Sequence, residues 1–495
     1  MKKNIKNRIP GVLILLLLAI AMVLFMAILI KIKLLPTKLL LLAGGVFLLY
    51  AVCVFLLTRN SQRVGAMICG CMMTMLLLIA LMLGTPYLTR AVDTLGNITS
   101  VDVEIADMGV YVEADSAMSQ LSDLTGGSVG ILETLDRENT EEALADVEDK
   151  IGTLQVQNYT DVKELVDGLL HNEVDAILIN SAYLDLLTDV EGYTDTVSQL
   201  RKIYEYQAQT AIDIVDKKDP ANDWDVQDLF GQGEKENTDR VFTMYISGID
   251  SRSGLIAKSN SDVNILATVN VDTRQVLLVS TPRDFYVPLP ISNGIPDKLT
   301  HAGIYGIDVS VGTLEMLYDT EIDYYFRVNF SGFERIIDAL GGVTVHSDYA
   351  FSAGGYSYSK GENFLNGAEA LRFARERKSF STGDRQRGKN QMEVIKAVIE
   401  KAMSPAILTG YMDIMEIVSG SFETSMPYDL IAELVRDQLD KGGSWNVVSC
   451  SVDGSDGSKI PYSMSTSAYV MIPDQSTVDA AIAKIQQVKN GEILN

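Results

Sequence analysis

The residues best suited to chemistry are basic side chains gathered in one stretch of an otherwise acidic region. Residues 372–389 contain only Glu376 and Asp384 as acids, against the basic Arg372, Arg375, Arg377, Lys378, Arg385, Arg387 and Lys389. Guanidinium groups are planar and donate paired hydrogen bonds, which suits phosphate oxygens. Arg387 and Gln391 are four residues apart on a predicted helix and therefore share a face. The stretch predicts a phosphate site, with a solvated run of charges at helix ends as the alternative.

Two carboxylates could hold a metal ion beside such a phosphate. Asp250 follows a predicted strand in the run Gly248–Arg252, and Asp262 opens the next strand twelve residues later. Carboxylate oxygens suit Mg²⁺, which shares its coordination sphere with phosphates. Taken alone, either aspartate is better explained as a turn or cap residue. Arg283 follows the predicted strand 276–280, and ligands of open α/β sheets collect at such strand ends.

Alternating strands and helices must position these side chains, and the pattern predicts two α/β regions. Residues 91–235 are expected to form a small α/β domain with a largely parallel sheet, ending in a polar linker at 216–239. Residues 236–495 are expected to form a second, larger α/β domain. In the first domain we expect strands at 101–105, 109–112, 128–132 and 176–180, and helices at 140–151 (capped by Asn139) and 161–170. In the second we expect strands at 241–247, 263–270, 276–280, 324–330 and 469–472, and helices at 331–340, 384–403 and 477–488.

The first 90 residues have the composition of a membrane unit. They carry ten basic and no acidic residues, so the net charge of −24 divides into +10 here and −34 in the remainder. Three uncharged apolar stretches, 9–30, 39–57 and 64–83, each have about the 20 residues that cross a bilayer. The basic residues favour a cytoplasmic N-terminus. We therefore expect a multi-pass protein of the cell membrane whose large C-terminal part is extracellular.

Composition also argues against several classes of function. A domain of net charge −34 would be repelled by nucleic acid, so no nucleic-acid partner is expected. Of four cysteines, three lie in apolar stretches, and there is no CxxC pair, which argues against disulfides or a zinc site. The sequence has no HExxH, Walker A or GxSxG motif. Among only three histidines, His301 is interpreted as a surface or polar-core residue rather than a proton carrier.

The order of the motifs resembles that of the LytR-CpsA-Psr family over about residues 240–490. The matching segments are GIDSR at 248–252, SDVNILATVNVDT at 261–273, VLLVSTPRDFYVPLP at 276–290, GENFLNGAEALRFARERK at 361–378 and GDRQRGKNQ at 383–391. Residues 91–235 are similar to an accessory domain that some members carry. The resemblance implies an α-β-α sandwich core with a mixed central sheet and an apolar pocket for a polyprenyl tail.

The resemblance also implies a function: a membrane-anchored phosphotransferase of the bacterial cell wall. Members transfer a glycopolymer, such as teichoic acid or capsule, from an undecaprenyl-pyrophosphate carrier to peptidoglycan, forming a phosphodiester with Mg²⁺ as cofactor. Carried over, Asp250 and Asp262 match the metal ligands, and Arg283 matches the arginine that grips the pyrophosphate. Asp284 would orient Arg283 or assist deprotonation. The further pyrophosphate-binding and catalytic matches are Arg252, Arg375, Arg377, Arg387 and Gln391.

Two departures from the family pattern and two rival functions accompany this interpretation. Position 390 is asparagine where the family commonly has arginine, and Arg385 or Lys389 is the candidate substitute. Three membrane spans exceed the single span commonest in the family. A non-catalytic, membrane-tethered receptor for lipid-linked glycan or cell-wall fragments is the alternative function. Pyrophosphatase activity would be a side reaction, with water in place of the acceptor hydroxyl.

Overall fold

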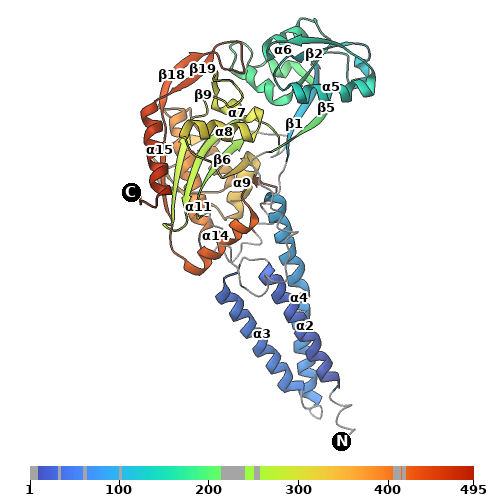
Figure 1. Ribbon diagram of the computed structural model, residues 1–495, viewed down its shortest axis with the longest axis vertical. Helices are drawn as coiled ribbons and strands as arrows, with labels where there is room; N and C mark the ends of the chain where they lie inside the picture. The colour runs from blue at the N-terminus through green and yellow to red at the C-terminus, as the bar shows by residue number, and fades with distance from the viewer. Residues whose placement is uncertain are drawn as a thin grey trace.

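The protein consists of an N-terminal stalk of helices, a large α/β domain and a smaller α/β domain beside it (Figure 1). This computed structural model describes residues 9–31, 35–58, 64–99, 103–212, 240–249, 257–404, 414, 418 and 420–494, with side chains at all of these except 9–14, 64 and 87–99. We call residues 103–212 the accessory domain and residues 240–494 the core domain. The predicted linker at 216–239 lies outside the described residues.

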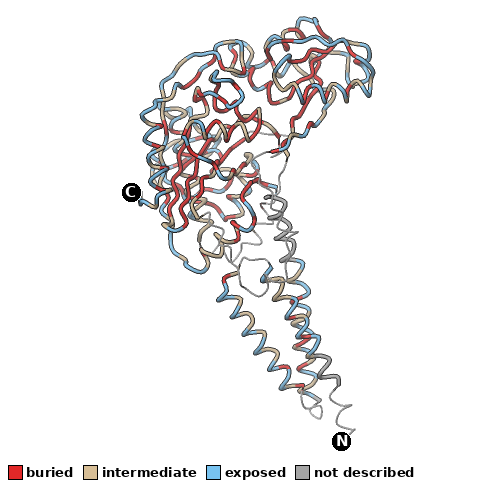
Figure 2. The backbone as a smooth tube through the Cα atoms, in the orientation of Figure 1, coloured by how far each residue is buried: buried red, intermediate tan, exposed pale blue. Residues whose placement is uncertain are grey.

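The stalk contains three helices, α2 (Ile9–Lys31), α3 (Thr37–Thr58) and α4 (Val64–Thr99). Two segments, Thr37–Thr58 and Gly65–Pro86, are long and apolar enough to cross a membrane. Only 6% and 17% of the residues in their most apolar stretches are buried, whereas the core helices of a soluble domain are mostly buried. Figure 2 shows the same exposure along the stalk.

The three predicted spans are therefore supported only in part. In α2 the apolar stretch with described side chains, Leu15–Lys31, is shorter than a full span, so the span at 9–30 stays a prediction. Helix α4 continues to Thr99, past the predicted domain boundary at residue 90. The accessory domain therefore follows directly from a helix that begins in the apolar stalk.

The accessory domain is built on a five-stranded sheet in the order β3-β2-β4-β1-β5. Strand β2 is parallel to β3 and β4, but β1 is antiparallel to both β4 and β5, so the prediction of a largely parallel sheet was wrong. The strands are β1 (Val103–Glu113), β2 (Ser128–Leu132), β3 (Gln155–Tyr159), β4 (Ala176–Asn180) and β5 (Leu200–Ala211). The helical segments are η1 (Leu121–Leu124), α5 (Arg137–Ile151), α6 (Val162–Leu170), η2 (Ser181–Asp189) and η3 (Thr196–Gln199).

Two local predictions in this domain need correction. The strands predicted at 101–105 and 109–112 are one strand, β1, because the polar Asp107 between them is satisfied within the sheet: its Oδ1 accepts a hydrogen bond from Gln207 on β5 at 3.2 Å. Helix α5 begins at Arg137 rather than at 140. Asn139 lies inside its first turn and donates a hydrogen bond to Asp136, so it is not the cap.

The core domain is built on a six-stranded mixed sheet in the order β16-β11-β6-β7-β8-β17. Strands β11 and β6 are parallel, as are β8 and β17, and the other neighbours are antiparallel. The predicted strands and helices of this domain are confirmed, with boundaries shifted by one or two residues. The strands are β6 (Val241–Ile249), β7 (Ser261–Asn270), β8 (Gln275–Thr281), β11 (Tyr324–Asn329), β16 (Phe422–Thr424) and β17 (Asn446–Ser451).

Helices cover both faces of this sheet, as the α-β-α expectation requires (Figure 1). Side chains alternate between the faces along each strand. On β6, Tyr245 packs with one helix layer, whereas Phe242 and Ile246 face the other. The first layer is α7 (Leu299–Tyr305), α8 (Ile307–Tyr318) and α15 (Gln475–Lys489); the second is α9 (Phe330–Ala339), α10 (Gly367–Arg375), α11 (Asp384–Ala402) and α14 (Tyr428–Lys441).

Four short antiparallel pairs lie around the main sheet. They are β9 (Tyr286–Pro288) with β10 (Pro296–Lys298), β12 (Val343–Ser347) with β15 (Gly361–Leu365), β13 (Phe351–Ala353) with β14 (Tyr356–Tyr358), and β18 (Gly454–Lys459) with β19 (Ala468–Pro473). The pair β9–β10 carries the chain from Arg283 to α7, and thus links the candidate site to the accessory-domain side of the core domain.

Candidate functional site

Sheet register brings Asp262 and Arg283 together. Strands β7 and β8 are antiparallel, with Asn264 opposite Thr281, so the start of β7 and the residues just after β8 lie at one edge of the sheet. At this edge Nη1 of Arg283 donates a hydrogen bond to Oδ1 of Asp262 at 2.7 Å. The two side chains are 26% and 22% exposed, so both are accessible to a ligand.

Helices α10 and α11 supply the other arginines. Helix α10 begins with a capping box between Asn366 and Glu369 and ends at Arg375. The guanidinium of Arg375 lies 4.0 Å above the ring of Phe330, a cation–π contact that fixes its position. In the first turn of α11, Arg387 forms an ion pair with Asp384.

These side chains form the polar mouth of a largely apolar cavity of about 620 Å³, which lies between the second helix layer and the sheet. A cavity of this size is typical of small-molecule sites. The polar lining includes Asp262, Arg283, Arg375, Arg377, Arg387 and Gln391, all predicted from the sequence, and also Asn329, which was not. The apolar lining comes from four strands and four helices, and includes Ile246, Val263, Phe326, Ile337, Leu371, Ile395 and Leu434.

A second, more polar cavity of about 520 Å³ meets the first at the same side chains. It shares Asp262, Arg283, Arg387 and Gln391 with the apolar cavity. Its other walls include His346, Tyr349, Asp384, Lys389 and Asp453. The arginines therefore stand between an apolar space and a polar one. This arrangement suits a ligand with an apolar tail, a central anion and a polar head.

The electrostatic balance at the mouth favours an anion. The pKa of Arg387 is lowered by burial and by the neighbouring Arg283 and Arg377, although Asp384 opposes the shift. For Arg283, burial opposes ionisation, but Asp262 and Asp284 outweigh it and raise the pKa. Both guanidinium groups stay charged at neutral pH. A phosphate at the mouth would relieve the mutual repulsion of the arginines.

Three predicted residues are not among those that line the cavities: two are not described, and the third lies behind Arg283. Asp250 and Arg252 lie outside the described residues. Asp284 lines neither cavity; its Oδ2 lies 3.7 Å from Nε of Arg283 and its Oδ1 lies 3.5 Å from Nζ of Lys298. This placement fits an orienting role for Asp284 better than proton transfer to substrate.

The asparagine that departs from the family pattern brings no charge to the mouth. Asn390 is 2% exposed and donates a hydrogen bond to the backbone carbonyl of Phe373 at 3.2 Å. Of the two proposed substitutes, Arg385 is bound to Asp453 at 2.6 Å and to the Gly454 carbonyl at 2.7 Å. Both line the polar cavity, and Lys389 is the better placed of the two because the guanidinium of Arg385 is already engaged.

His301 is a buried polar-core residue and lines neither cavity, so it is not placed to transfer a proton to a ligand there. Its Nδ1 lies 2.7 Å from Oδ1 of Asp297 and 3.0 Å from Oγ of Ser463. Because serine and aspartate contact the same ring nitrogen, and all three side chains are buried, the cluster lacks the geometry of a nucleophilic triad. Burial lowers the pKa of His301, but Asp297 and Asp189 outweigh it and raise the pKa to about 9. A cationic imidazole cannot act as a base.

No pattern in the sequence indicates Lys298, and the apolar pocket that the resemblance implies could not be located from the sequence. Lys298 is 2% exposed and carries a charge at the end of β10, inside the core domain. Cavity-lining and core residues are both Val, Ile, Leu and Phe, at strand spacing on the strands and helical spacing on the helices, so their sequence patterns are the same. Only the packing of α9, α10, α11 and α14 leaves the space open.

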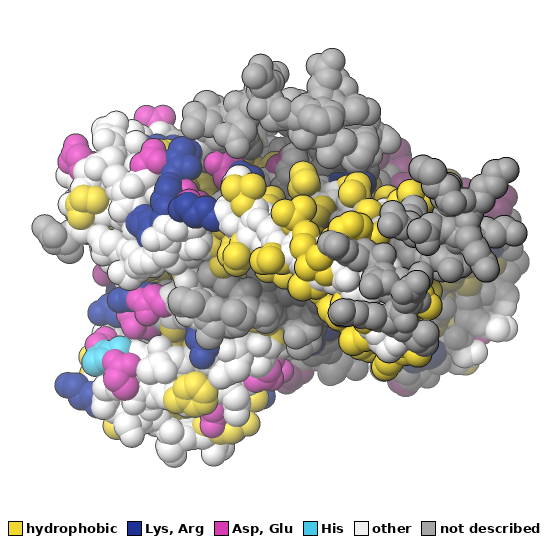
Figure 3. All heavy atoms as spheres, turned by 90° about the horizontal axis from the view of Figure 1, so that it is seen from below, with side chains coloured by type: hydrophobic (Ala, Val, Ile, Leu, Met, Phe, Trp, Pro, Cys, Tyr) yellow, Lys and Arg dark blue, Asp and Glu magenta, His cyan; other side chains and the backbone are white. Residues whose placement is uncertain are grey.

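The helices around the apolar cavity also lie next to the stalk. Ile28 of α2 packs in one apolar cluster with Ile336 of α9 and with Tyr428 and Ala432 of α14. Nζ of Lys38, in α3, lies 2.7 Å from Oδ1 of Asp440 at the end of α14. Seen from the stalk end, hydrophobic side chains gather in one region of the described surface, and charged side chains lie mainly to its side (Figure 3). The cavity thus opens within the half of the core domain nearest the apolar helices.

Fold and site together define a class: an α-β-α protein with apolar N-terminal helices and an apolar cavity that ends in an anion site. A family model described as the LytR_cpsA_psr family matches residues 181–487. The chain belongs to this family.

Its relatives include Polyisoprenyl-teichoic acid–peptidoglycan teichoic acid transferase TagU of Bacillus subtilis (strain 168), which is 36% identical over 220 residues, 44% of this chain and 70% of that protein. The protein of the same name from Halalkalibacterium halodurans is 33% identical over 273 residues, 55% of this chain and 81% of that protein.

Solved structures also resemble the chain. B. subtilis TagV is 27% identical with a TM-score of 0.44, covering 51% of this chain and 98% of that one. B. subtilis TagU is 29% identical with a TM-score of 0.40, covering 52% and 99%.

A second family model, described as DNA polymerase processivity factor, matches residues 68–179, less than a quarter of the chain. Residues 103–179 of this range hold 18 acidic and three basic side chains, a balance that repels DNA.

Proposed function

We propose that this protein transfers a glycopolymer of the teichoic acid type from a polyprenyl-pyrophosphate carrier to peptidoglycan. The observation that carries the proposal is the meeting of an apolar and a polar cavity at Asp262, Arg283, Arg387 and Gln391. The apolar tail would occupy the apolar cavity, the pyrophosphate would lie at these shared residues, and the glycan would occupy the polar cavity. The activity after which the relatives are named, teichoic acid transfer to peptidoglycan, agrees with this ligand.

The chemistry asks the protein mainly to align and to neutralise charge. A hydroxyl of the acceptor attacks the phosphorus that carries the glycan, a new P–O bond forms, and polyprenyl phosphate leaves. Arg283, Arg375, Arg377 and Arg387 would stabilise charge that develops on the bridging and leaving oxygens. Arg283 starts in an ion pair with Asp262, so it must exchange a carboxylate for phosphate oxygens when the substrate binds.

The residues at the mouth fit a magnesium ion by their chemistry. Asp262 offers a partly exposed carboxylate at the cavity mouth, and Mg²⁺ is commonly held by one or two carboxylates plus substrate phosphates. Within the described residues there is no group of three or more potential metal ligands. Asp262 would hold the ion together with Asp250, which lies outside those residues. When bound, Mg²⁺ supplies positive charge to the pyrophosphate oxygens.

The same arrangement supports a location in the cell membrane with the core domain outside. Two apolar helices form a membrane anchor, and the cavity opens in the half of the core domain beside them. A polyprenyl tail resides in the bilayer. A cavity next to the membrane helices could therefore take up the tail while the lipid moves only a short way out of the bilayer. The basic residues flanking the stalk favour an outward core domain, which would place the site next to peptidoglycan.

The test is a transfer assay with the purified full-length chain in lipid nanodiscs. The substrates are a synthetic polyprenyl-pyrophosphate glycan and peptidoglycan fragments, with Mg²⁺, and mass spectrometry follows the phosphodiester product. Transfer that depends on Arg283 is the expected result. Tight binding of the lipid without product would favour the receptor function, and release of phosphorylated glycan without acceptor would indicate a pyrophosphatase.

A further inference from the structure

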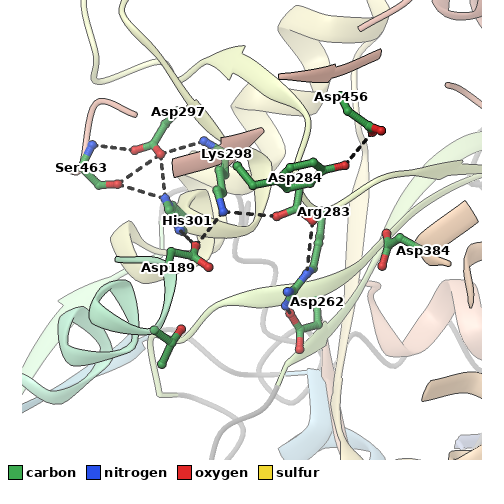
Figure 4. Close-up of polar contacts among 12 residues, drawn as sticks. Asp189, Asp262, Arg283, Asp284, Asp297, Lys298, His301, Asp384, Asp456 and Ser463 are labelled. Atoms are coloured by element: carbon green, nitrogen blue, oxygen red, sulfur yellow. Dashed lines mark hydrogen bonds and ion pairs between the residues drawn. The ribbon is translucent and has the colours of Figure 1, made fainter. Parts of the chain in front are cut away.

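A row of alternating charges connects the accessory domain to the arginine at the cavity mouth (Figure 4). Asp189 closes η2 of the accessory domain, and its Oδ2 accepts a hydrogen bond from Nζ of Lys298 at 2.7 Å. The same Nζ lies 3.5 Å from Oδ1 of Asp284. The other oxygen of Asp284 lies 3.7 Å from Nε of Arg283. The row thus begins in one domain and ends at the substrate site of the other.

Lys298 makes this row sensitive to Asp189. Its side chain is 2% exposed, and a buried ammonium is costly unless carboxylates compensate it. Within the described part of the chain its carboxylate partners are Asp189, at hydrogen-bonding distance, and Asp284, at a longer one. Without the charge of Asp189, Lys298 would draw Asp284 toward itself. Asp284 would then move away from Arg283.

Such a movement of Asp284 would change the orientation of the Arg283 guanidinium. Its Nη1 is held by Asp262, but its buried Nε has no hydrogen-bond partner among the described residues. Asp284 is the carboxylate that faces this nitrogen, at a distance just beyond a hydrogen bond. The guanidinium is therefore aimed by Asp262 from the cavity side and by Asp284 from behind. A change in the position of Asp284 alters the direction of the Arg283 fork.

Asp189 is itself fixed by the core domain. Nε2 of His301 lies 3.3 Å from its Oδ2, and Nδ1 of the same ring lies 2.7 Å from Asp297. Asp297 accepts a hydrogen bond from the backbone N–H of Ser463 at 2.9 Å. Asp189 is the accessory-domain member of this cluster, so its position depends on how the two domains dock.

We propose that Asp189 is a positioning residue for Arg283, acting from the accessory domain through Lys298 and Asp284. The docked accessory domain thereby completes the pyrophosphate-binding geometry of the core domain. This inference rests on the proposed function for its effect on transfer, and on Arg283 alone for its effect on pyrophosphate binding.

The test is a double-mutant cycle in the full-length chain, measuring kcat for transfer and the Kd for geranylgeranyl pyrophosphate. Residues in one ion-pair network couple, so Asp189→Asn should lower kcat about 3- to 10-fold when Arg283 is present, and less than about twofold in an Arg283→Ala background. A purely structural role would lower both equally. Asp189→Glu keeps the charge and should recover part of the loss.

Glu104→Gln is the matched control for domain docking. Glu104 of β1 is also buried at the domain interface, where it pairs with Arg327 and accepts a hydrogen bond from the N–H of Ile307 at 2.9 Å. It has no contact with the row that ends at Arg283, so kcat should stay within about twofold of wild type while the melting temperature falls. An equal fall of kcat in Glu104→Gln and Asp189→Asn would overturn the positioning role.

The outcomes separate this inference from the proposed function. If the wild-type chain transfers nothing, the proposed function fails, and the Kd for geranylgeranyl pyrophosphate decides the inference. Asp189→Asn must then raise that Kd with Arg283 present and leave it unchanged in Arg283→Ala. No effect of Asp189→Asn on either quantity refutes the inference. Should Asp189→Asn not fold, the cycle is run with Asp189→Glu, whose smaller loss must likewise disappear in Arg283→Ala.

Discussion

Arg283→Ala is the substitution whose effect the structure defines best. The side chain is 26% exposed at the junction of the two cavities, and Nη1 is within hydrogen-bonding distance of the carboxylate that a phosphate would replace. A hydrogen bond to a charged group contributes about 1.5–3 kcal/mol. Loss of one such bond in the transition state lowers the rate by about one to two decades. We therefore expect kcat/KM for transfer to fall about 10- to 100-fold.

The control is Arg385→Ala, in the first turn of α11. Arg385 is 40% exposed and lines the polar cavity but not the apolar one, and its guanidinium is engaged by Asp453 and by the Gly454 carbonyl. Its removal breaks a surface ion pair, which contributes about 0–1 kcal/mol, so transfer should change less than about twofold. Arg283→Lys keeps the positive charge but loses the planar pair of donors, so its transfer rate should lie between those of Arg283→Ala and Arg385→Ala. An Arg283→Ala variant that folds and transfers within twofold of wild type, or an Arg385→Ala variant that loses as much, would refute the reasoning.

Three further outcomes follow from the described residues. Ile395→Trp places a large ring in the apolar cavity, so the Kd for geranylgeranyl pyrophosphate should rise at least about tenfold, while that for dimethylallyl pyrophosphate should change little. His301 has a pKa raised to about 9 from 6.5, so its stabilisation is complete below about pH 6.5 and is lost as pH rises through 9; His301→Gln should remove that part of the pH dependence of the melting temperature. Glu423 has a pKa raised to about 7, by burial first and by Glu104, with Arg327 opposing; the folded state therefore binds a proton that the unfolded state has lost. The free energy of unfolding should therefore fall as pH rises from about 4.5 to 7. Glu423→Gln should make the melting temperature less dependent on pH in this range.

Each of these outcomes has a result that contradicts it. Equal weakening of both pyrophosphates by Ile395→Trp would mean that the substitution disturbs the mouth and not the cavity. For the two titrations, the wild-type and variant melting temperatures must diverge in the stated pH windows. If the melting temperatures of wild type and variant change with pH in parallel through those ranges, the assigned group is not the one that titrates.

The sequence was sufficient to predict what depends on residue type and local spacing. Asp262 and Arg283 could be assigned because they stand in motifs that match those of a known family, whereas an aspartate at a strand end is, taken alone, better explained as a turn or cap residue. Antiparallel pairing of β7 with β8, which brings the two together, could not be read from the strands themselves. Likewise Asp107 interrupted an apolar pattern and made one strand look like two, because its partner on β5 is a hundred residues away.

What remained beyond the sequence depends on contacts between distant segments. Asp189 and Lys298 are 109 residues apart, and each alone is an ordinary charged residue at the end of a segment. Their ion pair exists only because the accessory domain docks beside α7. The apolar cavity was equally hidden, since Ile395 and Val263 look like core residues until the helices are placed.

The central claim is that a polyprenyl-pyrophosphate lies with its tail in the apolar cavity and its phosphates among the arginines. The most direct measurement is photo-crosslinking of the full-length chain in nanodiscs with a polyprenyl pyrophosphate that carries a diazirine near the end of its tail, followed by peptide mass spectrometry. We predict labelling of cavity residues such as Ile395, Met403 and Leu434, suppressed by unlabelled lipid and weakened by Arg283→Ala. Labelling confined to the apolar stalk, or unaffected by Arg283→Ala, would contradict the account.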